Sequence, residues 1–79
     1  MEEIKTEWKI LCSSHRACPA VMNDLKNIGF HKVKDTPNSP TSDISAILVV
    51  IDEQKIQETA KTLIQKHRSD IQRITITHF

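Results

Sequence analysis

Glycine is nearly absent from this 79-residue chain, which contains one glycine, and tyrosine is missing altogether. The single glycine excludes a Walker loop or a dinucleotide-binding turn, because both need several residues without a Cβ atom close to phosphate. One tryptophan and two phenylalanines, far apart in the sequence, do not form the stacking surface of an RNA-binding sheet. Long apolar runs and the pattern of a signal peptide are also missing, so we expect a cytoplasmic protein with no membrane partner.

Neither sign of charge dominates the composition. Eleven Lys and Arg residues stand against ten Asp and Glu residues, and they are spread along the chain without a block. A dedicated nucleic-acid binder would carry a basic patch, so no nucleic-acid partner is expected. Two cysteines are fewer than small secreted domains use, which favours a reducing compartment. The length fits one domain spanning residues 1–79.

The first half of the chain alternates strand and helix patterns. Residues 7–12 place Trp8, Ile10 and Cys12 on one face of a strand. Pro19 suits the first position of a helix, which makes Cys18 the expected N-cap residue, and Gly29 suits the left-handed residue that ends the helix. Residues 30–34 predict a second strand, and residues 35–43, rich in Pro, Ser, Thr and Asn, predict a mobile loop that its prolines exclude from any sheet.

The second half repeats the order strand, helix, strand. Residues 44–51 form the strongest strand signal, Asp52 is suited to cap the following amphipathic helix, and residues 71–79 alternate as a final strand. Strand, helix, strand, strand, helix, strand is the order of two interleaved right-handed βαβ units. The sequence therefore predicts an α+β fold, the ferredoxin-like βαββαβ two-layer sandwich, with a four-stranded antiparallel sheet and both helices on one face.

The strand at residues 44–51 is apolar on both sides, although only one face of such a sheet is covered by helices. A central strand that tolerates exposed β-branched residues is one explanation. The interpretation we prefer is that another copy of the chain or a partner covers the open side. We expect a homo-oligomer, with Ile47, Val49 and Ile51 in its interface.

Three residues with metal-binding side chains fall between the first strand and the first helix. Cys12, His15 and Cys18 offer the thiolate and imidazole ligands that Zn²⁺ or Cu⁺ prefers, at a spacing short enough for one ion. A position at a helix N-terminus, beside Arg16, also predicts a lowered pKa for Cys18. The alternative is that Cys12 is a small core residue and His15 an ordinary loop residue.

The same turn contains a candidate anion-binding site. Ser13, Ser14 and Arg16 offer hydroxyl groups and a guanidinium next to the free N–H groups of the helix start. The other three histidines, His31, His67 and His78, are dispersed, and we expect them at the surface.

The first 33 residues resemble heavy-metal-associated domains, which bind metal through a Cys-x-x-Cys motif in the corresponding loop. His15-Arg16-Ala17-Cys18 occupies the motif position, with His15 in place of the first cysteine. Cys18-Pro19 is also similar to the Cys-Pro of small sulfur carriers of the TusA type. The whole chain resembles regulatory sandwiches of the PII, CutA and ACT kinds in its plan. Such families commonly oligomerise through the open sheet face or strand edges.

Two classes of function follow. We expect a small, non-enzymatic binding or regulatory module that self-associates through its sheet and takes a small-molecule or metal ligand. The alternative is a soft-metal-binding or sulfur-carrier protein that uses Cys12, His15 and Cys18. The sequence shows no pattern of residues typical of acid–base or nucleophilic catalysis, so catalysis is not expected.

Overall fold

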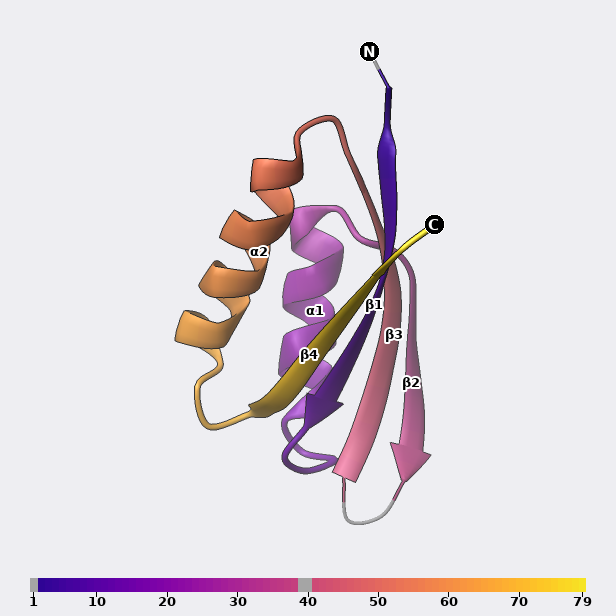
Figure 1. Ribbon diagram of the computed structural model, residues 1–79. Coiled ribbons are helices and arrows are strands. Elements are labelled where there is room, and N and C mark those ends of the chain that lie inside the picture. Colours follow the sequence, from indigo (N-terminus) through magenta and orange to yellow (C-terminus); the bar gives the residue numbers. More distant parts are fainter. Residues whose placement is uncertain (1, 39–40) are drawn as a thin grey trace.

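The described part of the chain contains four strands and two helices. The computed structural model describes residues 2–38 and 41–79. The elements are β1 (Ile4–Cys12), α1 (Cys18–Ile28), β2 (His31–Asn38), β3 (Thr41–Val50), α2 (Glu53–Lys66) and β4 (Ile71–His78) (Figure 1). The sheet has the order β2-β3-β1-β4, and every neighbouring pair is antiparallel. The predicted ferredoxin-like fold is confirmed.

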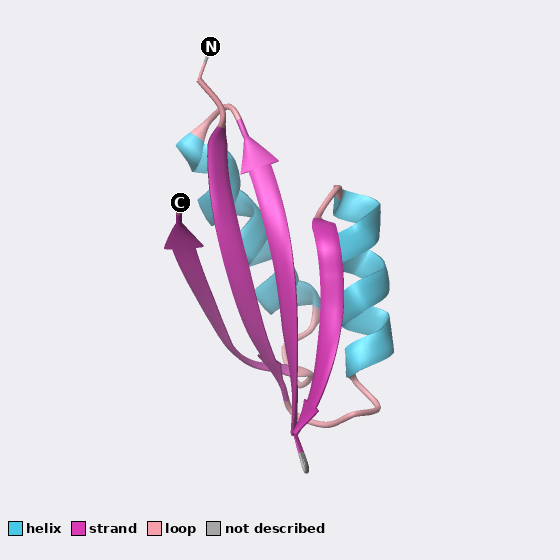
Figure 2. Cartoon of the chain, turned by 90° about the vertical axis from the view of Figure 1, so that its right-hand side faces the viewer, coloured by secondary structure: helices cyan, strands magenta, loops and turns pink. Residues whose placement is uncertain are grey.

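The two helices lie side by side against one face of the sheet, and Figure 2 shows the opposite face. We call this the open face, because it carries neither of the helices found in residues 2–38 and 41–79. Neither of those helices is long and apolar enough to cross a membrane.

The core lies between the sheet and the helices, and Trp8 on β1 is at its centre. Trp8 is fully buried, and its ring meets the ring of Phe30 edge to face with centroids 5.0 Å apart. The indole N–H donates to the Thr6 hydroxyl at 2.8 Å, and that hydroxyl donates to the Leu48 carbonyl at 3.0 Å. Through these contacts the buried Trp8 ring and its N–H group link β1 to β3 and to the residue before β2.

The helix ends follow from local chemistry. Asp52 caps α2, and its carboxylate accepts from the Gln54 N–H at 3.0 Å, as predicted. Gly29 ends α1 in the left-handed region with φ 118°, which a residue without a Cβ adopts at little cost. The prediction for the start of α1 is wrong by one residue: Ala17 is the N-cap, and Cys18 is the first helical residue.

The predicted loop at residues 35–43 is wrong for most of its length, because β2 runs on to Asn38 and β3 begins at Thr41. Pro37 is paired with Ser42 in the ladder, and it is tolerated because β2 is an edge strand whose outer N–H groups need no partner. The remaining part of that prediction, residues 39–40, lies outside the described residues. Near its start β2 holds one extra residue, at Lys32 with φ 51°, between the pairs His31–Ile47 and Lys34–Ser45.

The prediction that β3 is apolar on both sides is confirmed. Ile44, Ala46 and Leu48 point into the core and are buried. Ile47 and Val49 point to the open face and are half-buried, while Ile51 follows the end of β3 and is 61% exposed.

Candidate functional site

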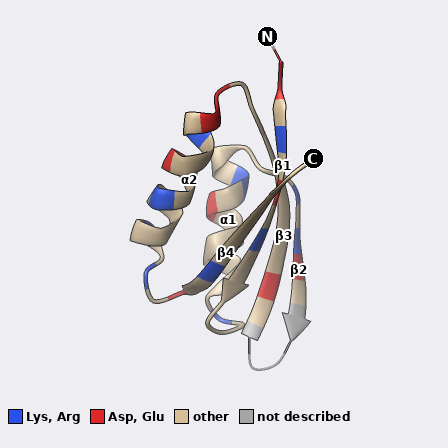
Figure 3. Cartoon of the chain, in the orientation of Figure 1, with Lys and Arg blue, Asp and Glu red and all other residues tan. Residues whose placement is uncertain are grey.

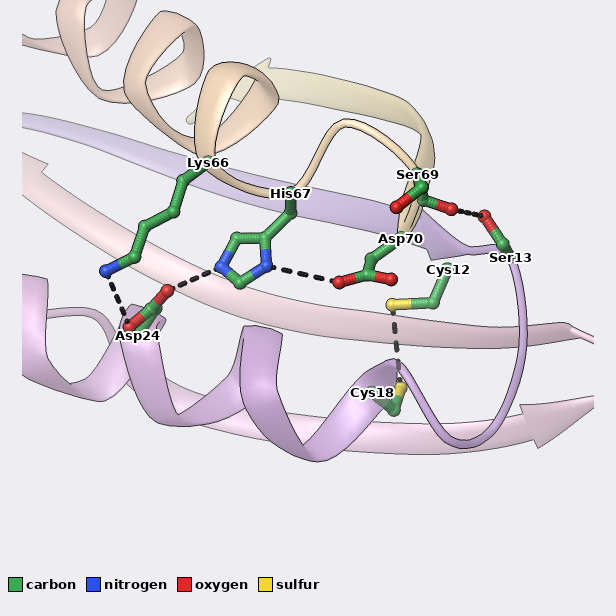
Figure 4. A network of polar contacts seen from close by, with 8 residues as sticks. All are labelled: Cys12, Ser13, Cys18, Asp24, Lys66, His67, Ser69 and Asp70. Atoms are coloured by element: carbon green, nitrogen blue, oxygen red, sulfur yellow. Dashed lines mark hydrogen bonds and ion pairs between the residues drawn. The ribbon is translucent and has the colours of Figure 1, made fainter.

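Cys12 and Cys18 meet where β1 ends and α1 begins. Their sulfur atoms are 3.6 Å apart, both thiols are free, and both side chains are buried (Figure 4). Cys12 is the last residue of β1 and Cys18 the first of α1, so the five-residue connection brings the two thiols together. The Cys18 thiol also lies 3.4 Å from an oxygen of Asp35, which belongs to the neighbouring strand β2.

Both thiols are held in the protonated form. Burial, and after it the hydrogen bond with Cys18, raises the pKa of Cys12 to about 12. Burial also raises the pKa of Cys18, and the nearby Asp35 adds to the effect. The prediction of a lowered Cys18 pKa is therefore wrong, because removal of the sulfur from water outweighs the helix N-terminus.

His15 does not join the two thiols. Its ring nitrogen Nδ1 hydrogen-bonds the hydroxyl of Ser42, a buried residue at the start of β3. In residues 2–38 and 41–79, no three His, Cys, Asp or Glu side chains are placed to hold one metal ion. The structure thus brings together two of the three candidate ligands, and the zinc or copper site stays a prediction.

The candidate anion-binding residues have different surroundings. Ser13 connects β1 to the turn before β4, because its hydroxyl donates to the Ser69 carbonyl at 2.8 Å and its N–H to the Asp70 carbonyl at 2.7 Å (Figure 4). The Ser14 carbonyl accepts from the N–H of Ala17, while Arg16 is exposed. Anion binding by this turn stays a prediction.

A buried histidine forms a polar network that the sequence did not indicate. The expectation that His67 lies at the surface is wrong: it is 7% exposed at the end of α2. Its Nε2 contacts the carboxylate of Asp24 on α1, and its Nδ1 lies 3.5 Å from the Asp70 carboxylate (Figure 4). Lys66 reaches the same Asp24 at 3.3 Å. The network therefore joins the two helices to each other and to the turn before β4.

Acid should weaken this network. The hydrogen bond with His67, and secondarily the contact with Lys66, holds the pKa of Asp24 below its ordinary value of 3.8. As the pH falls below about 4, the unfolded chain binds this proton before the folded chain does, so stability is lost through the folded pKa. We expect Asp24→Asn to lower the free energy of unfolding at pH 7 and to make its acid-side decline shallower.

Urea denaturation followed from pH 7 down to about pH 2 measures this effect. Lys66→Gln is the matched variant: it removes the weaker contact to Asp24 and should change the slope less. An unchanged acid-side slope in Asp24→Asn would show that the network does not contribute to acid sensitivity.

The open face is apolar toward one end and polar toward the other. Ile47 lies between Glu7 of β1 and His31 of β2, and Val49 lies opposite Lys5. Nearer the start of β3 the face holds a shallow depression of about 410 Å³, lined by Lys9, Leu11, Thr36, Asp43, Ser45, Arg73 and Thr75. Leu11 forms its apolar centre between Asp43 and Arg73, which are its neighbours on the two adjoining strands. Charges of both signs are distributed over helices and sheet alike (Figure 3).

Comparison with known proteins identifies a fold. No protein-family model matches the chain, and no curated protein matches it. A solved structure of an uncharacterized protein from Thermotoga maritima is similar, with a TM-score of 0.76, 17% identity, and 99% of each chain covered. The C-terminal domain of the MgtC protein from Mycobacterium tuberculosis has a TM-score of 0.72 at 9% identity, over 96% of this chain and 87% of that one.

An ACT domain protein from Streptococcus pneumoniae is also similar, with a TM-score of 0.62 at 13% identity, over 95% of this chain and 89% of that one. These identities are low, so the matches establish the architecture alone: a ferredoxin-like, ACT-like small domain. None of the three is described as a heavy-metal-associated domain, and that resemblance stays a prediction.

Proposed function

We propose that this protein is a small binding or regulatory module that self-associates through the open face of its sheet. The observation that carries the proposal is the pair Ile47 and Val49, two aliphatic side chains toward the apolar end of a face that the described helices leave open. A strand with one solvated face normally carries polar side chains on that face. Two successive open-face positions with large apolar side chains therefore favour a covered surface.

A second copy of the same chain fits the charges on this face. On the open face of β1, Lys5 and Glu7 lie opposite Val49 and Ile47, and Lys9 follows them, so the charges beside the apolar pair alternate in sign. Two copies related by a two-fold axis can place the lysines of one beside the glutamate of the other. The net charge of +1 adds little repulsion between copies.

The size of the face is adequate. Four strands span roughly 19 Å, and the nine residues of β1 extend about 30 Å. A standard interface buries about 800 Å² per partner, which is roughly a seventh of the 5344 Å² accessible surface of this chain. The sheet face with its rim of long side chains supplies an area of that order.

The polar depression gives the module a place for a ligand. Lys9, Arg73 and Asp43 line it together with the hydroxyls of three Ser and Thr residues, around the apolar Leu11. Convergent charges and hydroxyls around a small apolar floor suit a small polar molecule. Its position on the same face as Ile47 and Val49 would allow the ligand to act on association.

Sedimentation equilibrium of the reduced wild-type chain tests the proposal. At about 100 µM, well above the Kd of a specific interface, we expect the average mass to exceed that of one 9.0 kDa chain. A mass equal to one chain at this concentration would remove self-association from the account.

The second candidate, a soft-metal-binding or sulfur-carrier protein, is favoured by the contact between the Cys12 and Cys18 thiols. Both are buried and protonated, so binding of Zn²⁺ or Cu⁺ would have to displace their protons. Native mass spectrometry with and without each ion separates the two candidates, since it reports bound metal and the number of chains together.

A further inference from the structure

The sulfur atoms of Cys12 and Cys18 are placed to bond to each other. A disulfide requires about 2.05 Å between sulfur atoms, so the 3.6 Å contact must shorten by roughly 1.5 Å. The register of β1 with β4 already shifts between Leu11 and Cys12, so one of the two ladders that hold Cys12 is irregular at this residue. Cys18 is the first residue of α1, and the connection between the two cysteines can follow a small movement.

We propose that Cys12 and Cys18 form a reversible intramolecular disulfide, and that this pair is a modification site for low-molecular-weight disulfides such as oxidised glutathione. The site is separate from the self-association surface, because Cys12 points into the core and its neighbour Leu11 points to the open face.

Entry to the site is through the first turn of α1. The N-cap residue is Ala17, whose methyl side chain cannot accept the hydrogen bonds that a Ser, Thr, Asp or Asn cap accepts. The first turn also contains no acidic residue within the described helix, so nothing there offsets the helix dipole. A weakly capped helix end opens locally without unfolding of the whole chain, and that opening exposes Cys18 to a small reagent.

The chemistry balances in two exchange steps. When the first turn opens, Cys18 loses its proton to water, and its thiolate attacks one sulfur of oxidised glutathione; one glutathione thiolate leaves and a mixed disulfide remains. Cys12 then loses its proton and attacks the Cys18 sulfur, which forms the Cys12–Cys18 bond and releases the second glutathione thiolate. Two protein thiols are oxidised, one small disulfide is reduced, and the two protons end on the released glutathione.

Closure changes the contacts of α1. Reduced Cys18 is within hydrogen-bonding distance of Asp35, and the disulfide has no S–H to donate, so this link between the start of α1 and the edge strand β2 is lost. In its place a covalent bond joins α1 to the end of β1. Because the bond also constrains the unfolded chain, we expect the oxidised protein to melt at least about 5 °C above the reduced protein.

The test uses the full chain, incubated with excess oxidised glutathione, then denatured and alkylated before intact mass spectrometry. The wild-type chain should lose about 2 Da, the mass of two hydrogen atoms, and take up no alkyl group. Cys12→Ser should retain one glutathione on Cys18, while Cys18→Ser should react at least about ten-fold more slowly, since Cys12 has no helix end that opens over it.

Three results would overturn the proposal: two alkylated thiols in the wild-type chain, glutathione on both cysteines, or chains linked to each other. The wild-type protein alone decides the matter if a variant fails to fold. Its oxidised form must keep the near-ultraviolet signal of Trp8 and show the higher melting temperature, and an oxidised chain that lacks either would contradict closure within the native fold.

Discussion

Replacement of Trp8 by alanine should leave much of the protein unfolded at 25 °C. Truncation of a fully buried aromatic side chain costs about 3–5 kcal/mol, because the cavity closes only in part. Proteins have free energies of unfolding of about 5–15 kcal/mol, and small domains lie near the low end because they bury a smaller share of their surface. The substitution also takes away the ring that Phe30 meets and the indole N–H that donates to the Thr6 hydroxyl.

Urea denaturation followed by circular dichroism measures this loss, with Trp8→Phe as the matched control. Phenylalanine keeps most of the ring contact with Phe30 and removes the hydrogen bond to Thr6, so its cost should be smaller than that of alanine. A Trp8→Ala chain as stable as the wild type would contradict the placement of this side chain at the centre of the core.

Val49→Lys should convert the self-associated protein to monomers. A lysine in the apolar part of the proposed interface would be buried without a partner, which costs several kcal/mol. Association should therefore weaken by about 100-fold or more. Val49 is half-buried on the open face opposite Lys5, so the separated chain can hold the new ammonium group in water and remain folded.

Gln57→Lys is the control, because it adds the same charge at an exposed position of α2. Sedimentation equilibrium should give monomers for Val49→Lys and the wild-type mass for Gln57→Lys, with unchanged circular dichroism for both. If Val49→Lys is folded and associates as tightly as the wild type, the interface lies elsewhere on the molecule.

The elements that the sequence predicted correctly are those defined by short-range patterns. The apolar alternation of β1, the cap at Asp52 and the left-handed stop at Gly29 each depend on residues within a few positions. Because the order of these elements leaves few right-handed topologies, the sheet order followed as well.

The errors fall where distant residues decide the structure. Pro37 indicates a loop by itself, but an edge position in the sheet accommodates it. His67 is buried because Asp24, 43 residues earlier in the chain, supplies a carboxylate on the facing helix. The pKa of Cys18 depends on burial against Cys12 and on Asp35 from β2, and the local helix start gave no sign of either.

The candidate site was predicted in part for the same reason. The closeness of Cys12 and Cys18 follows from a short connection between a strand and a helix, and the sequence shows that connection. The direction of the His15 ring depends on Ser42, which reaches it only through the pairing of β1 with β3. Ile47 and Val49 were recognised from the missing alternation of β3 alone.

Isotope-filtered nuclear Overhauser spectroscopy on an equal mixture of ¹³C-labelled and unlabelled chains tests self-association through the open face most directly. Signals that pass between two copies identify the side chains in contact, so the account predicts transfer to the methyl groups of Ile47 and Val49. The helix side offers the competing surface, since Ile28 and Ile64 are 44% and 50% exposed there. Transfer confined to Ile28 and Ile64, or no transfer between copies, would contradict the account.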